Sequence, residues 1–174
     1  EIDSPKRHKR TEGRLSFLAN LALAENAAQR IAFILQHNAI SAHKLMWIEQ
    51  LTHKQLDDAI NERSAVRYQD WCFNTDYKKE KIQLILTALN TYHEQHNDQL
   101  GVSKARLYRM ATLNQPENLI HHFIDEMLDD GRLQQTRGWI HLPEHKIQFN
   151  TEEKSRWTDV LNEFEKANGQ AIWV

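Results

Sequence analysis

Hydrophobic residues recur at helical spacing over most of the chain, and short polar stretches separate the helical segments. Apolar positions repeat in steps of three and four over residues 14–35, with an interruption at Asn26. Ser41 is a favourable N-cap for a short helix, and Thr52 followed by Gln55 has the pattern of a capping box. The first third of the chain is therefore predicted to be a group of short helices.

The pattern then alternates between strand pairs and further helices. Residues 65–68 and 71–73 are rich in Val, Tyr, Trp and Phe and predict a hairpin. Asp76 is expected to cap a long helix over residues 77–96, and Ser103 a short basic helix.

The last third of the chain repeats this order. Pro116 is expected at the first position of a helix with a broad apolar face, and Gly131 at its left-handed end. Residues 132–136 and 139–142 predict a second hairpin around Arg137-Gly138. Asn150 with Glu153 predicts another helix, followed by a strand over residues 171–174.

The order of helix, short helix, helix and hairpin thus occurs twice. Each hairpin resumes on a tryptophan, Trp71 and Trp139, which lie 68 residues apart and are expected to cover the helical cores. The pattern favours a mainly α (α+β) fold of tandem winged helices, each with three helices and a small antiparallel hairpin. An all-helical repeat is the alternative. The expected organisation is a linker (1–13), two winged helices (14–75 and 76–149) and the first helix of a third (150–174).

Composition narrows the class of protein. The 174 residues carry 22 Lys and Arg against 24 Asp and Glu, a formal charge of −2, which disfavours a general nucleic-acid coat protein. Hydrophobic content of 40% favours a folded chain. The single cysteine, Cys72, is expected to be a core thiol in a reducing, cytoplasmic setting. No apolar run approaches the roughly 20 residues that cross a bilayer, so no membrane association is expected.

The two ends of the chain favour a piece of a longer protein, because there is no initiator Met and the apolar end carries no turn signal. The basic cluster at residues 6–10 is interpreted as a solvated connector, with a nuclear address or a phosphate contact as alternatives.

Motifs for catalysis or metal binding are weak. His141 to His145 spells H-x-x-E-H, but Pro143 disfavours the helix that this zinc motif requires. His93 and His96 miss H-E-x-x-H by one position and are interpreted as solvated residues of a helix end. Five glycines and no G-x-x-x-x-G-K-[S/T] speak against a phosphate loop. The sequence therefore predicts no enzyme, no metal and no cofactor in this chain.

Charge placement bears on nucleic-acid binding. The third helix of a winged helix often enters the major groove and needs cations to do so. Here the helix over residues 116–130 carries five acids and no Lys or Arg, and Lys54 is outnumbered by Asp57, Asp58 and Glu62. Five basic residues elsewhere in the second unit are candidates for contacts with RNA or the ribosome, against the alternative of a solvated face: Lys104, Arg106, Arg109, Arg132 and Arg137.

Three segments carry a family resemblance. Residues 91–96 (TYHEQH), 104–111 (KARLYRMA) and 138–146 (GWIHLPEHK) resemble the C-terminal extension of bacterial selenocysteine-specific translation elongation factors. The front of the chain resembles the junction between the last β-barrel of that family and its winged-helix array. The resemblance covers almost the whole chain.

The resemblance implies a function for the longer protein. Members of the family are GTP-dependent factors, with GTP and Mg as cofactors, that deliver selenocysteinyl-tRNA to UGA codons and bind the ribosome and an mRNA hairpin. It implies that this segment is a monomeric, non-catalytic spacer before the winged helices that grip the hairpin, with weak or no nucleic-acid binding of its own. The alternatives are a winged-helix DNA-binding regulator and, on the H-x-x-E-H motif alone, a zinc hydrolase.

Overall fold

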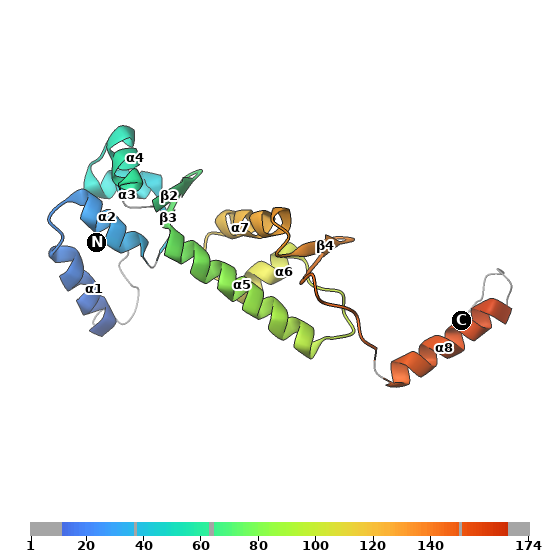
Figure 1. Cartoon of the computed structure of the whole chain (residues 1–174). Helices are drawn as coiled ribbons and strands as arrows, with labels where there is room; N and C mark the ends of the chain where they lie inside the picture. Colours follow the sequence, from blue (N-terminus) through green and yellow to red (C-terminus); the bar gives the residue numbers. More distant parts are fainter. Residues whose placement is uncertain (1–11, 37, 63–64, 150, 167–174) are drawn as a thin grey trace.

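The computed structural model describes residues 12–36, 38–62, 65–149 and 151–166, which form helices joined by two small antiparallel sheets (Figure 1). The helices are α1 (Glu12–Ala22), α2 (Ala27–Leu35), α3 (Ala42–Glu49), α4 (His53–Asn61), α5 (Thr75–Gln95), α6 (Lys104–Ala111), α7 (Glu117–Asp129) and α8 (Thr151–Lys166). The strands are β1 (Ile40–Ser41), β2 (Ala65–Tyr68), β3 (Trp71–Asn74), β4 (Gln134–Thr136) and β5 (Trp139–His141).

Capping side chains set most of the helix starts. The Ser41 hydroxyl accepts from the Lys44 N–H and the Ser103 hydroxyl from the Arg106 N–H, as predicted. Thr52 and Gln55 form the predicted capping box of α4. Two predicted helix starts differ from the structure by one or two residues. Asn74, and not Asp76, caps α5, because the side-chain oxygen Oδ1 of Asn74 accepts from the Tyr77 N–H at 2.6 Å. Pro116 is the N-cap residue of α7, one position earlier than expected.

The first unit places α2, α3 and α4 against a three-stranded sheet in the order β1-β3-β2. In this sheet β2 and β3 form the predicted hairpin, and β1 is an extra strand that the sequence pattern did not indicate. The core is built from three helix faces and the strands β1 and β3; its members are Ile31, Ile34, Leu35, Ile40, Ala42, Leu45, Leu56, Ala59, Ile60 and Cys72.

The second unit repeats this arrangement with α5, α6 and α7 and the hairpin β4–β5. Arg137 and Gly138 both have positive φ, 51° and 87°, which is the backbone of a tight hairpin turn. The isolated bridge between Val102 and Ile140 takes the place that β1 has in the first unit. The two units thus share their fold, and the predicted tandem winged-helix architecture is confirmed.

The two cores meet within β3. Cys72 belongs to the core of the first unit, whereas Phe73 packs against Phe123 in the core of the second, with 5.2 Å between ring centroids. The strand then runs into α5 without a linker. The predicted boundaries at residues 13/14, 75/76 and 149/150 stay predictions, although α1 already begins at Glu12.

Of the remaining predictions about the fold, some were confirmed, some were wrong, and some lie outside the described residues. Trp71 is partly buried, but Trp139 is 45% exposed and does not cover the core, because the neighbouring Ile140 takes the inward position. The second hairpin is shorter than expected and begins at Gln134. The predicted helix after Asn150 is present as α8. The connector at residues 1–11, the cap at Asn150 and the strand at 171–174 lie outside the described residues.

Candidate nucleic-acid interface

Three acids, two on α7 and one at its C-cap, are paired with basic side chains. Lys104 reaches Asp125 at 2.5 Å, Lys78 reaches Glu126 at 2.7 Å, and Arg132 reaches Asp130 at 2.5 Å. The hydrogen bond from Arg132 holds the pKa of the Asp130 carboxyl below its usual value. The acidic character of this helix is therefore part of a local charge network, and two of the five candidate cations, Lys104 and Arg132, are used within it.

The hairpin of the first unit lies against α7 of the second. The rings of Tyr68 and His122 stack almost in parallel, with 3.6 Å between their centroids. The Trp71 indole N–H donates to the Asn118 side-chain oxygen at 3.0 Å, and the Asn118 amide reaches Gln69 at 3.5 Å. These contacts occupy the outer side of the helix that a winged helix would insert into a groove. Both charge and position therefore speak against groove reading by α7.

The remaining candidate cations lie on two separate elements. Arg106 and Arg109 are exposed on α6, where the Arg106 guanidinium lies over the Tyr92 ring at 4.9 Å from the centroid. Arg137 is exposed in the turn between β4 and β5. Their exposure leaves them available to a phosphate backbone, and their role as RNA or ribosome contacts stays a prediction.

The third helix of the first unit is also poor in available cations. On α4, Asp57 forms an ion pair with Arg67 of β2 at 3.2 Å. Lys54 is exposed on the same helix, and two further acids, Asp58 and Glu62, follow it in the sequence. The predicted deficit of positive charge on this helix is thus retained in the fold.

The expectation that His93 is solvated was wrong. His93 is 7% exposed, its Nε2 accepts the Leu142 N–H at 3.3 Å, and its ring stacks on His145 with 3.6 Å between centroids. Burial, with smaller contributions from His145 and His141, lowers the pKa of His93 to about 4. Spacing along α5 could not show this, because the residues that cover His93 come from the segment after β5.

The H-x-x-E-H segment forms structural contacts. His141 lies in β5, donates from Nδ1 to the Leu142 carbonyl and contacts Thr136 Oγ1 through Nε2, both at 3.0 Å. His145 Nε2 donates to the Gln99 carbonyl at 2.8 Å. Among the described residues no group of three or more His, Cys, Asp or Glu is placed to hold a metal ion. These imidazoles hold the chain segment that leaves the second unit.

Cys72 is fully buried in β3, and burial raises the pKa of its thiol to about 11. A thiol with so little thiolate at neutral pH is a poor nucleophile. The prediction of a core thiol is confirmed.

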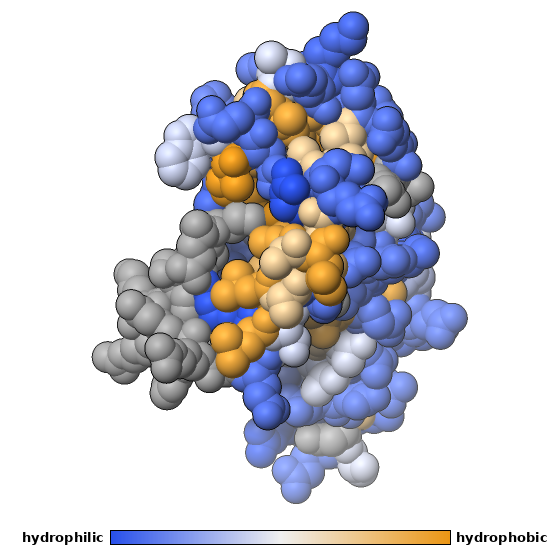
Figure 2. All heavy atoms as spheres, turned by 90° about the vertical axis from the view of Figure 1, so that its left-hand side faces the viewer, coloured by the Kyte–Doolittle hydropathy of each residue, from blue (hydrophilic) through white to orange (hydrophobic). Residues whose placement is uncertain are grey.

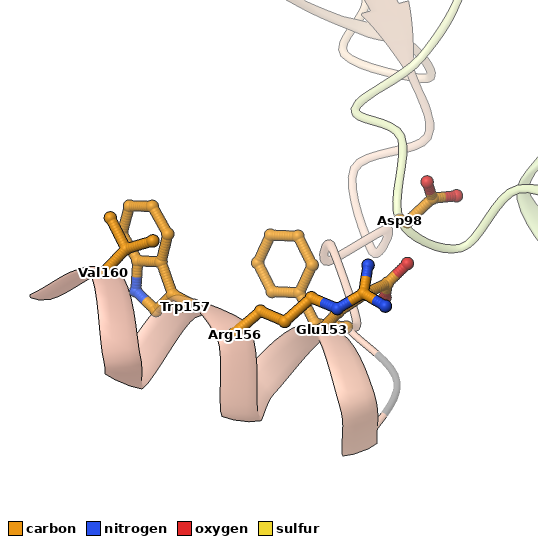
Figure 3. Close-up of a pocket in the computed structure, with 6 residues that line it drawn as sticks. Asp98, Glu153, Arg156, Trp157 and Val160 are labelled. Carbon is orange, nitrogen blue, oxygen red and sulfur yellow. The ribbon is translucent and has the colours of Figure 1, made fainter. Parts of the chain in front are cut away.

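Apolar side chains are left uncovered at both ends of the described chain. Figure 2 shows hydrophobic residues gathered in the middle of the face that it presents. Near the N-terminal end of the described chain, Leu15, Leu18 and Leu23 are exposed. At the other end, Trp157 and Val160 project from the same side of α8 (Figure 3). With Phe149 and Asp98 they line a shallow pocket that also includes Glu153 and Arg156.

Several contact residues gave no signal in the sequence. Tyr68, Asn118 and His122 join the two units, and Trp47 is the most exposed aromatic residue of the described chain, at 75%. Trp47 occupies an outward position of α3, whose other face is apolar, so only a comparison with the repeated helix could have indicated that Trp47 is a surface residue of interest.

In the described part of the chain, no helix is both long and apolar enough to cross a membrane.

Comparisons with known proteins agree with this architecture. Residues 12–59 match the family model "Selenocysteine-specific elongation factor, winged helix 1/3", and residues 86–142 match "Elongation factor SelB, winged helix". A selenocysteine-specific elongation factor of Haemophilus influenzae is 86% identical over 174 residues, which are the whole of this chain and 28% of that relative. The protein of the same name from Escherichia coli is 31% identical over 156 residues, 90% of this chain and 25% of that relative.

Proposed function

The chain belongs to the family of selenocysteine-specific elongation factors and contains winged-helix domains of that family, and from this premise we propose that it is a non-catalytic spacer within such a factor. In this proposal the longer protein uses GTP and Mg to deliver selenocysteinyl-tRNA to UGA codons on the ribosome. The spacer holds a fixed distance between the GTPase and tRNA-binding body and the winged helices that bind an mRNA hairpin.

The observation that carries the proposal is the contact of the first hairpin with α7. Tyr68 and Trp71 contact the outer side of α7, and β3, the strand that contains Trp71, continues directly into α5. Two units that share a strand and a side-chain contact are suited to transmit a fixed geometry. A regulator that reads DNA would need this helix free and basic, so the alternative of a DNA-binding regulator is less well supported.

A binding titration tests the proposal. The 174-residue chain is titrated against a fluorescent mRNA hairpin of the selenocysteine insertion type and against a hairpin of equal length with a scrambled loop. We expect weak binding to both, without preference, that decreases steeply with salt because contacts with the phosphate backbone depend on charge and carry no sequence information. Tight binding that prefers the insertion hairpin would contradict the spacer role.

A further inference from the structure

We propose that the outer face of α3 binds an unpaired base of single-stranded RNA, with Trp47 as the stacking surface and Lys44 and His43 beside the phosphate backbone. The inference deepens the proposed function, because it assigns a ligand class and a site to a chain that works next to RNA. Nothing in the family models or in the names of the relatives assigns a role to this helix face.

The geometry of α3 presents these residues together. His43, Lys44 and Trp47 are spaced so that they share one side of α3, Gln50 follows at the C-cap, and all four are exposed. The opposite side carries Ala42 and Leu45, which are fully buried in the core of the first unit. A tryptophan side chain is rarely left so exposed to water, and the flat indole face of Trp47 is a sequence-tolerant platform for a nucleobase.

The charge around Trp47 favours a polyanion over an apolar protein partner. Glu49, the acid of α3, accepts three hydrogen bonds from Arg30, at 3.2 Å, 3.0 Å and 2.7 Å. Asp70 is likewise occupied at the start of the helix, where it accepts from the Ser41 hydroxyl at 2.6 Å and the His43 N–H at 3.2 Å. Within the described part of the chain, the Lys44 side chain has no hydrogen bond or ion pair, so its charge remains available to a phosphate.

The internal repeat gives independent support. Ser41 and Ser103 cap equivalent helices, so Lys44 of α3 corresponds to Arg106 of α6, and Trp47 corresponds to Arg109. Both positions are exposed in both units, and α6 contains no acid. The second helix of each unit therefore presents a cation at the same place, in contrast to the acidic third helices. In the first unit a base-stacking residue stands beside that cation, which points to RNA with unpaired bases.

The experiment uses labelled oligouridylate of about ten nucleotides, a length within the range that one single-strand-binding domain covers, and a duplex RNA of similar length. Binding to the 174-residue chain is followed by anisotropy of the label and by tryptophan fluorescence at low salt. We expect the single strand to quench tryptophan emission and the duplex to leave it nearly unchanged. Trp47→Leu should weaken binding of the single strand about tenfold, and Trp47→Phe should restore most of it, since stacking one base on an aromatic ring is worth about that factor.

Trp157→Leu is the matched control, because Trp157 is also exposed, at 57%, and lies on α8. It should bind as the parent chain does. Lys44→Gln should weaken binding about twofold and reduce its salt dependence. The proposal is overturned if no quenching occurs at low salt, if Trp47→Leu binds normally, or if Trp157→Leu weakens binding equally. These outcomes are separate from the hairpin titration, which tests preference between two folded RNAs.

Discussion

The two hairpins of this chain are repeats of one another, yet they lie in different surroundings. Trp71 and Trp139 take the same position in their strands, followed by the buried Cys72 and Ile140. Trp71 is partly buried and hydrogen-bonded to Asn118 of the next unit, whereas Trp139 is 45% exposed. The strand pattern thus fixes the fold of a hairpin, whereas the element packed against the hairpin determines the environment of its aromatic residue.

The largest expected effect concerns the strand bridge behind the second hairpin. A Cβ at Gly101 would lie 2.1 Å from the Ile140 carbonyl oxygen, which is backbone and cannot move aside without breaking the bridge. We expect Gly101→Ala to lower the free energy of unfolding of the second unit by about 3 kcal/mol, the upper end of overpacking costs. Urea unfolding followed by circular dichroism measures this. Gly13→Ala, on α1 with nothing within 4 Å of the added Cβ, is the control and should cause no loss.

The two tryptophans provide the next test. Trp71→Ala removes partly buried surface and the hydrogen bond to Asn118, so we expect a loss of about 2 kcal/mol, roughly half the cost for a fully buried tryptophan. Trp139→Ala should cost less than about 1 kcal/mol, since its ring is largely in water. Unfolding curves of the two variants under the same conditions measure both losses in the free energy of unfolding. Equal losses would show that the contact with α7 does not stabilise the first hairpin.

A smaller, pH-dependent effect is expected where the chain leaves the second hairpin. The pKa of His93 is about 4 in the folded chain, below the usual value of about 6.5 that the unfolded chain should have. The unfolded state therefore binds more protons between these values, and stability that is present above pH 6.5 falls as the pH drops toward 4. Part of this fall, on the order of 1 kcal/mol, should disappear in His93→Gln, which stays neutral.

The control for that experiment is His53→Gln, on the exposed start of α4. It should keep the pH dependence of the parent chain. If His93→Gln also keeps it, the buried imidazole does not titrate as the structure indicates.

Local signals in the sequence predicted much of the fold. Ser41, Ser103 and the Thr52–Gln55 box act through atoms three residues away, so their patterns are visible in the chain itself. The burial of His93 and the stacking of Tyr68 on His122 depend on segments distant in sequence, 49 and 54 positions away, and no local pattern encodes them.

The candidate site was predicted only in part, because some of its features are visible in the local sequence and others depend on distant segments. The acidic composition of α7 was visible in the sequence, but its ion pairs with Lys78 and Lys104 and its cover by the first hairpin were not. The prediction that Trp139 covers the core was wrong, because an aromatic residue in a short strand need not face inward. Alternation along β5 places Ile140 inward instead.

In the proposed spacer, the first hairpin lies against α7 and fixes the two units relative to one another. Spin labels at Lys54→Cys on α4 and Thr87→Cys on α5 report their separation by double electron–electron resonance, and buried Cys72 should stay unlabelled. We expect one narrow distance distribution in the parent background, which broadens when Tyr68→Ala and Asn118→Ala are combined. A broad distribution in the parent background, or a narrow one that the two substitutions leave unchanged, would contradict the account.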